Sequence, residues 1–110
     1  MRIAAAAVLA LAMVGAATGA QSAFVTGNEL YKLCSTRGQE DACVIYVMGA
    51  SDMLDVQQAG STKVCVPSVG VTGNQMRDVV VKWLGAHPEQ RHASAASLIW
   101  LVLKESWPCR

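Results

Sequence analysis

The chain has 110 residues, 53% of them hydrophobic, and its nine Lys and Arg residues against eight Asp and Glu give a formal net charge of +1. This length leaves room for one domain. The charges are balanced and unclustered, so the sequence lacks the basic stripe that binds a phosphate backbone and the charged patch that binds anionic lipid. We therefore expect no nucleic-acid partner.

The N-terminus has the order of a secretory signal peptide: a charged start, an apolar run over residues 3–14, and small residues up to Ala20. A membrane anchor is the alternative, but the apolar run has 12 residues, whereas a helix that crosses a bilayer needs about 20. We expect cleavage after Ala20, or else after Ala23. The prediction is a signal peptide over residues 1–20 and a mature domain over residues 21–110 without a stable membrane anchor.

Four cysteines lie in the mature part, namely Cys34, Cys43, Cys65 and Cys109. Export brings them into an oxidising compartment, where thiols pair, and a domain of this size gains most from such cross-links. The spacing suggests Cys34–Cys43 as a staple between two consecutive helices, and Cys65–Cys109 as a tie between a long loop and the C-terminus. The crossed pairing, Cys34–Cys109 with Cys43–Cys65, stays open. No Cys-x-x-Cys pair is present, so we expect no metal site.

The first predicted helix starts near Asn28. This residue is a suitable N-cap because its side-chain oxygen can accept a backbone N–H of the first turn. Three apolar residues then fall on one face of the helix: Leu30, Leu33 and Cys34. Gly38 is expected to end the helix within about a turn of this stripe.

The second helix is predicted over about residues 40–57. Its apolar residues recur at spacings of three and four, as in a buried stripe; they are Cys43, Tyr46, Val47, Ala50 and Leu54. Val44, Ile45 and Met48 lie off this stripe, so the helix is apolar around much of its girth, and we place it at the centre of the domain. Gly49 disfavours a helix interior, so we expect it at a close approach of two helices.

Residues 58–71 are predicted to form a long loop that Cys65 ties down. The third helix then has the clearest start in the sequence, because Thr72 and Gln75 have the spacing of a capping box. Its apolar face follows a regular helical period, with Met76, Val79, Val80, Trp83 and Leu84. We expect this helix to end in the segment 85–88.

The fourth helix is predicted from Pro88, a residue favoured at the first helical position, to about Ser106. Its core stripe consists of Ala95, Leu98, Ile99, Val102 and Leu103. Trp100 and Leu101 lie off the stripe, so this helix should present a second apolar surface to a second copy or to a partner. The predicted fold class is therefore all-α, a small disulfide-stapled bundle of about four helices.

Few residues suggest catalysis. Asp52 and Asp55 share a helical face and could act as acid and base, but nothing around them indicates a pocket, so we interpret them as a solvated face. His87 and His92 are five residues apart and share no helical face; we expect His87 to cap or flank a turn and His92 to lie at the surface or at a partner. With the cysteines paired and no nucleophile elbow or phosphate loop, we expect neither an enzyme nor a cofactor.

Several motifs stand in order along nearly the whole mature chain. They are Gly27-Asn28-x-Leu30-x-x-x-Cys34, Cys43-x-x-Tyr46-x-x-Gly49, Cys65-Val66-Pro67, a segment that begins His87-Pro88-Glu89 and reaches Leu98-Ile99, and the ending Glu105-x-Trp107-Pro108-Cys109. Together they resemble the Rap/Tai family, the immunity proteins that protect bacteria from peptidoglycan amidase toxins of the type VI secretion system. No single motif is specific, but their order is.

The resemblance implies a periplasmic, all-helical, disulfide-bonded protein, often dimeric, that binds and occludes the active site of an injected amidase. Residues that contact the toxin lie in loops that vary within the family, so none is carried over; our hypothesis for the contact surface is the loop of residues 58–71. The alternative function is a small periplasmic helical stress chaperone, or another binding protein without a toxin partner. An enzyme that uses Asp52 or His92 is a third.

Overall fold

The computed structural model describes residues 25–57, 60, 63–67 and 69–110. The predicted signal peptide and both predicted cleavage sites lie outside these residues. The described part is helical, with no strand, and its elements are α1 (Gly27–Ser35), α2 (Glu40–Val56), α3 (Gly73–Ala86), the short 3-10 helix η2 (Pro88–Gln90) and α4 (Ala95–Ser106). The prediction of a small, disulfide-stapled all-α bundle of about four helices is confirmed.

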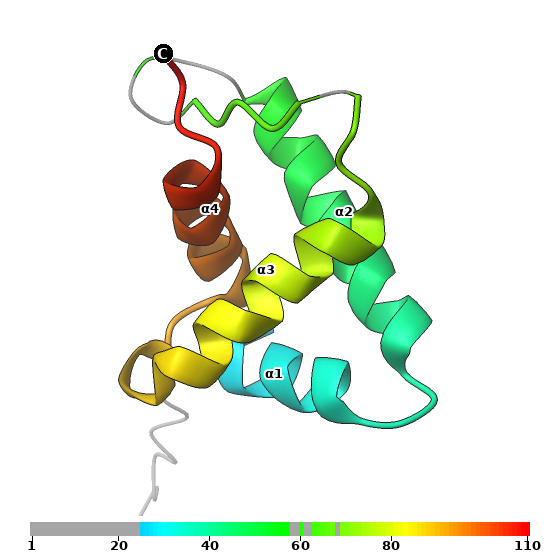
Figure 1. Cartoon of the computed structure of the whole chain (residues 1–110). Coiled ribbons are helices and arrows are strands. Elements are labelled where there is room, and N and C mark those ends of the chain that lie inside the picture. Colours follow the sequence, from blue (N-terminus) through cyan, green and yellow to red (C-terminus); the bar gives the residue numbers. More distant parts are fainter. Residues whose placement is uncertain (1–24, 58–59, 61–62, 68) are drawn as a thin grey trace, which may run out of the picture.

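The four helices surround one apolar core. α2 and α4 stand on opposite sides, α3 crosses between them, and α1 lies beneath at one end (Figure 1). α2 and α3 each contact all three of the other helices. The core consists of Leu30, Val47, Val64, Met76, Val80, Leu84, Ala95, Leu98, Ile99, Val102 and Leu103.

Capping boxes start α1 and α3. In α3 the box is the predicted one: the Gln75 N–H donates to Thr72 Oγ1 (3.1 Å) and the Thr72 N–H donates to Gln75 Oε1 (2.8 Å). In α1 the N-cap is Thr26 and not the predicted Asn28, because Glu29 at the third helical position completes a second capping box with Thr26. The Thr26 N–H lies 2.7 Å from Glu29 Oε2, and this backbone bond, with the Thr26 hydroxyl, lowers the pKa of Glu29.

The fourth helix begins later than predicted. Pro88 does start a helical turn, but it is the short η2, and α4 begins after Ser94, whose Oγ accepts the Ser97 N–H (3.2 Å). The segment between the two helices pairs with the chain just before and at the start of α1: the Gly27 N–H donates to the Ala93 carbonyl (2.9 Å) and the Ala95 N–H to the Val25 carbonyl (2.7 Å). These long-range backbone bonds compete with a continuous helix at this point.

The close approaches of the fold use two glycines that the sequence reasoning did not select. A Cβ on Gly27 would lie 2.5 Å from Leu98 Cδ1, and one on Gly73 would lie 2.5 Å from Met48 Sδ. Gly49, for which a close approach was predicted, has nothing within 4 Å of the position of a Cβ. That prediction is wrong because Gly49 points away from the core.

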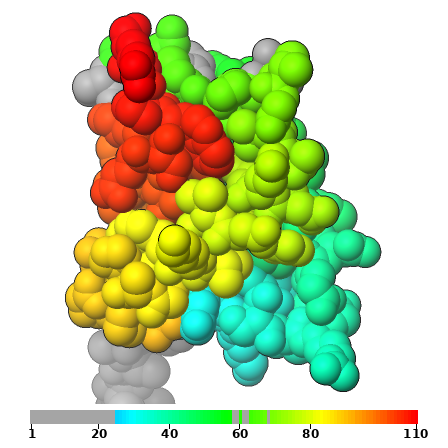
Figure 2. Space-filling model, viewed as in Figure 1, coloured from blue at the N-terminus to red at the C-terminus, as the bar shows by residue number. Residues whose placement is uncertain are grey.

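Two disulfides cross-link the bundle. Cys34 is bonded to Cys43 across the connection between α1 and α2, and Cys65 is bonded to Cys109 across 44 residues of sequence. This is the first of the two pairings that the sequence left open. The second bond holds residues 63–67 against the C-terminal segment, where the Cys65 N–H donates to the Trp107 carbonyl (3.2 Å); the two segments adjoin at one end of the molecule (Figures 1 and 2).

Within the described ranges, none of the helices combines the length and the apolar character that would let it traverse a bilayer.

Candidate functional site

The outer face of α2 carries large hydrophobic side chains in contact with solvent. Their exposed fractions are 69% for Ile45, 43% for Met48, 56% for Met53 and 79% for Val56. We call these four residues the outer apolar face of α2. As predicted for a central helix, α2 packs against α1, α3 and α4, and Cys43 and Val47 on its inner side are fully buried. Its outer side is not enclosed: Met48 reaches Gly73 of α3, but Ile45, Met53 and Val56 are more than half exposed.

A shallow apolar groove of about 440 Å³ runs along this face. It is lined by Ile45, Tyr46, Gly49, Ala50, Met53, Leu54 and Gln57 of α2 and by Ala96 of α4. Gly49 leaves the backbone bare at its floor. Burial, and secondarily the negative charge of Glu29, raise the pKa of the Tyr46 hydroxyl above its ordinary value of 10.0, so this group stays neutral at physiological pH. The groove therefore offers an uncharged apolar surface.

α2 is also the most acidic element of the domain. It carries Glu40, Asp41, Asp52 and Asp55, which are half of the eight acidic residues in the chain, and it has no Lys or Arg. All four side chains are exposed. The two at its N-terminus interact favourably with the helix dipole, whereas Asp52 and Asp55 near its C-terminus do not. The apolar face is thus accompanied by acidic side chains and by no basic side chain of α2.

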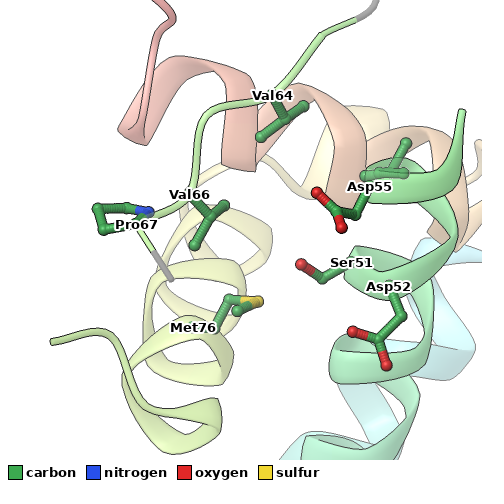
Figure 3. A pocket seen from close by; sticks show the side chains of 8 residues that line it. Ser51, Asp52, Asp55, Val64, Val66, Pro67 and Met76 are labelled. Atoms are coloured by element: carbon green, nitrogen blue, oxygen red, sulfur yellow. The ribbon is translucent and has the colours of Figure 1, made fainter. Parts of the chain in front are cut away.

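Asp52 and Asp55 line a depression that the sequence did not suggest. It has a volume of about 220 Å³ and lies between α2 and the residues 63–67. Figure 3 shows Ser51 and Asp55 facing the opposite wall, which Val64, Val66 and Met76 form. The expectation that these carboxylates have no pocket context is therefore wrong, although both are exposed, as expected of a solvated face.

The chemistry of this depression does not favour catalysis. Its lining is Ser51, Asp52, Leu54, Asp55, Val64, Val66, Pro67 and Met76, which contains no histidine, lysine or arginine. A general acid in a glycosidase is a carboxyl group held in an apolar environment, and both Asp52 and Asp55 are instead in contact with water. We interpret the depression as the acidic border of the outer face of α2.

The two histidines lie where the sequence placed them. His87 is the C-cap residue of α3; its ring stacks on Trp83 with 4.0 Å between ring centroids, and Nδ1 is hydrogen-bonded to the Trp83 carbonyl (2.8 Å). His92 is exposed, with Nδ1 bonded to the Glu89 carbonyl (3.0 Å). In the part of the chain that the structure describes, no three His, Cys, Asp or Glu side chains lie close enough together to hold a metal ion.

The second apolar surface predicted for α4 is smaller than the outer face of α2. Trp100 and Leu101 are both half-buried; Trp100 packs against the core, and the Lys104 ammonium lies 4.8 Å from the centre of its ring. The charged head of Lys104 therefore lies over the indole and covers part of it. The larger exposed apolar surface belongs to α2.

The loop that was predicted as a contact surface is partly fixed. Val64 is buried and belongs to the core, and the Cys65–Cys109 bond holds the neighbouring backbone. Further along, Val69 is 86% exposed. The described part of the loop thus combines a fastened half with an exposed apolar residue, and it adjoins α2 through the depression shown in Figure 3.

Comparison with known proteins identifies the family. No curated protein and no solved structure is significantly similar to the chain. The family of Rap1a immunity proteins, in contrast, matches residues 26–109. This match covers all four helices and all four disulfide-bonded cysteines. The chain therefore belongs to the family of Rap1a immunity proteins.

Proposed function

We propose that this protein is an exported immunity protein that binds a peptidoglycan amidase effector of type VI secretion and occludes its active site. The observation that carries the proposal is the family match over residues 26–109, which spans the whole folded domain. The resemblance of the sequence motifs to the Rap/Tai family supplies the amidase as the class of effector. Membership of the Rap1a family supports an immunity-type function and a protein partner, but it does not name the effector.

The geometry supports an action by contact. Two disulfides give a rigid scaffold, and an apolar outer face accompanied by acidic side chains has the composition of a protein-binding surface. An inhibitor of this kind needs no catalytic group of its own. We accordingly propose that the protein is not an enzyme, and that the loop of residues 58–71 takes part in the contact.

Export belongs to the same proposal. Disulfides persist in oxidising compartments such as the bacterial periplasm, which is where a peptidoglycan amidase acts on its substrate. We propose that residues 1–20 are a signal peptide, cleaved after Ala20 or after Ala23, and that residues 21–110 are the periplasmic form. Self-association into a homodimer, which is frequent in the resembling family, is part of this proposal.

The test is protection against a defined toxin. Type VI peptidoglycan amidases are each directed to the periplasm of a sensitive bacterium, with and without this chain, and survival is counted. Survival with at least one amidase, together with stoichiometric inhibition of peptidoglycan hydrolysis by the purified chain, is the expected result. Lysis by every amidase regardless of the chain would refute the proposal.

A second candidate, a small periplasmic stress chaperone, is favoured by one observation: the outer face of α2 exposes apolar side chains of the kind that bind unfolded clients. A chaperone would prevent aggregation of several unrelated proteins and would expose more apolar surface on acidification. The two functions are separated by an aggregation assay at low pH with unrelated client proteins. Suppression of their aggregation would favour the chaperone, and capture of one amidase in equimolar amount would favour immunity.

A further inference from the structure

The apolar side chains that the fold leaves uncovered are concentrated on one element. Of the five large hydrophobic side chains that are exposed in the described part of the chain, four belong to the outer apolar face of α2 and the fifth is Val69. A small domain that forms a tight core has no structural need for four such residues on one helix face. Exposed apolar patches with polar borders mark interaction surfaces.

The shape of this face suits an inserted side chain. Ile45 and Met53 line the groove, and Gly49 between them adds no side chain, so a projecting apolar residue of a partner can reach the α2 backbone. Buried anchors of this kind, seated in an apolar pocket, contribute most of the affinity at protein interfaces. The groove thus supplies the centre of a binding site.

The charge around the groove decides between possible occupants. Asp41, Ile45, Asp52 and Val56 recur at helical spacings, so carboxylates lie beside the apolar residues on the outer side of α2. In the part of the chain that the structure describes, no Lys or Arg lines the groove or the adjoining depression. A second copy docked by the same face would set Asp41 and Asp52 against the same two carboxylates of the other copy, and such like-charge contacts are costly.

We propose that the outer face of α2 is the docking surface for the amidase effector, and that the effector meets it with an apolar projection bordered by Lys and Arg side chains. This inference rests on the proposed function and specifies its contact surface. The depression makes the face continuous with residues 63–67 of the loop. The effector therefore contacts α2 in addition to the loop.

The experiment compares variants of the full mature chain, using as probe a purified type VI peptidoglycan amidase against which the wild-type chain protects. Ile45→Ser and Val56→Ser remove exposed apolar groups, and Asp41→Lys and Asp52→Lys reverse charges beside them. Val69→Ser tests the contribution of the loop separately, and a charge reversal at Glu89 in η2 is the control away from both surfaces. Because all of these residues are exposed, thermal unfolding should show each variant folded.

The binding kinetics give the expected pattern. Ile45→Ser should weaken the affinity by roughly tenfold or more, through faster dissociation. Asp52→Lys should slow association and reduce its dependence on salt, because it removes attraction to a basic partner. A charge reversal at Glu89, an exposed residue in η2, should change the affinity less than about twofold, since a rim charge away from the contact contributes little.

The other outcomes each overturn the inference, and they do so in distinguishable ways. If Ile45→Ser and Asp52→Lys bind as wild type while Val69→Ser does not, the loop alone is the contact and the proposed function stands. If light scattering shows a wild-type dimer that Ile45→Ser converts to a monomer, the face is occupied by a second copy. If the wild-type chain binds no amidase of the panel, the proposed function and this inference fail together.

Discussion

α2 and α3 pack against each other and are both rich in apolar residues, but they use these residues differently. α3 turns Met76, Val80 and Leu84 into the core and keeps no large hydrophobic side chain exposed. α2 buries Cys43 and Val47 on one side and leaves four large apolar side chains in water on the other. Large apolar side chains that the core does not bury, gathered on one helix face, indicate a surface that binds another molecule.

The largest expected effect is a difference in the free energy of unfolding between a substitution in α3 and one in α2. Leu84→Ala in α3 removes a fully buried side chain and should lower the free energy of unfolding by about 2–5 kcal/mol, because a cavity remains. Ile45→Ala in α2, which is 69% exposed, should change it by less than about 0.5 kcal/mol. Urea unfolding of both variants measures this. A loss of more than about 1 kcal/mol at Ile45, twice what an exposed position should show, would contradict a free outer face on α2.

The helix starts give the next effect. Thr72→Ala removes the N-cap of α3, which accepts the Gln75 N–H, and should cost about 1 kcal/mol. The N-cap of α2 is Gln39, whose side chain makes no capping hydrogen bond. Gln39→Ala should therefore leave the free energy of unfolding almost unchanged. Thermal unfolding of the pair tests this difference; equal losses of stability would contradict it.

Gly49→Ala should raise stability. Nothing lies within 4 Å of the new Cβ, and alanine is favoured over glycine in a helix interior by about 0.5–1 kcal/mol. Gly73→Ala serves as the contrasting variant, since its Cβ would lie 3.1 Å from Val44 Cγ1 and 2.5 Å from Met48 Sδ. A destabilised Gly49→Ala variant would mean that another helix or another copy packs closely there.

The smallest effect concerns the capping box of α1. Its third helical residue is the charged Glu29, whereas the corresponding residue in the capping box of α3 is the neutral Gln75. The hydrogen bonds from Thr26 lower the pKa of Glu29 below its ordinary value of 4.5, so the ionised side chain stabilises the folded state. This stabilisation is complete above pH 4.5 and is lost as the pH falls through the lowered pKa. Glu29→Gln should therefore lose less stability than wild type between neutral pH and pH 3.

Thermal unfolding at a series of pH values, for wild type and Glu29→Gln side by side, tests this. The carboxyl of Glu29 is fully exposed, so the difference between the two curves will be small. Parallel curves down to pH 3 would show that the capping box does not depend on the charge.

Local signals in the sequence predicted most of the fold. The Thr72 capping box and the stripe from Met76 to Leu84 were sufficient for α3, because they are properties of one segment. At α1 the sequence offers two N-cap residues, Asn28 and Thr26, and Glu29 decides for Thr26 because it completes the capping box. The delayed start of α4 depends on two long-range backbone bonds, from the Ala95 N–H to the Val25 carbonyl and from the Gly27 N–H to the Ala93 carbonyl, which no local pattern reveals.

The candidate surface was harder to predict for a physical reason. The helical pattern of a sequence shows that an apolar residue lies outside the buried stripe, but it does not show whether another element covers that residue. Ile45 of α2 and Trp100 of α4 are therefore alike in the sequence. Packing decides between them: Lys104 and the core enclose Trp100, while nothing in the described chain covers Ile45. The depression beside Asp52 likewise needs residues 63–67, which the distant Cys109 holds in place.

Methionine oxidation tests the central claim most directly, because the domain carries its own control. Met48 and Met53 are exposed on the outer face of α2, whereas Met76 is only 9% exposed in the core. Hydrogen peroxide should oxidise Met48 and Met53 well before Met76 in the free protein, and a bound amidase effector should protect Met53. Oxidation of Met53 at an unchanged rate in the complex would contradict the claim that this face is where the partner binds.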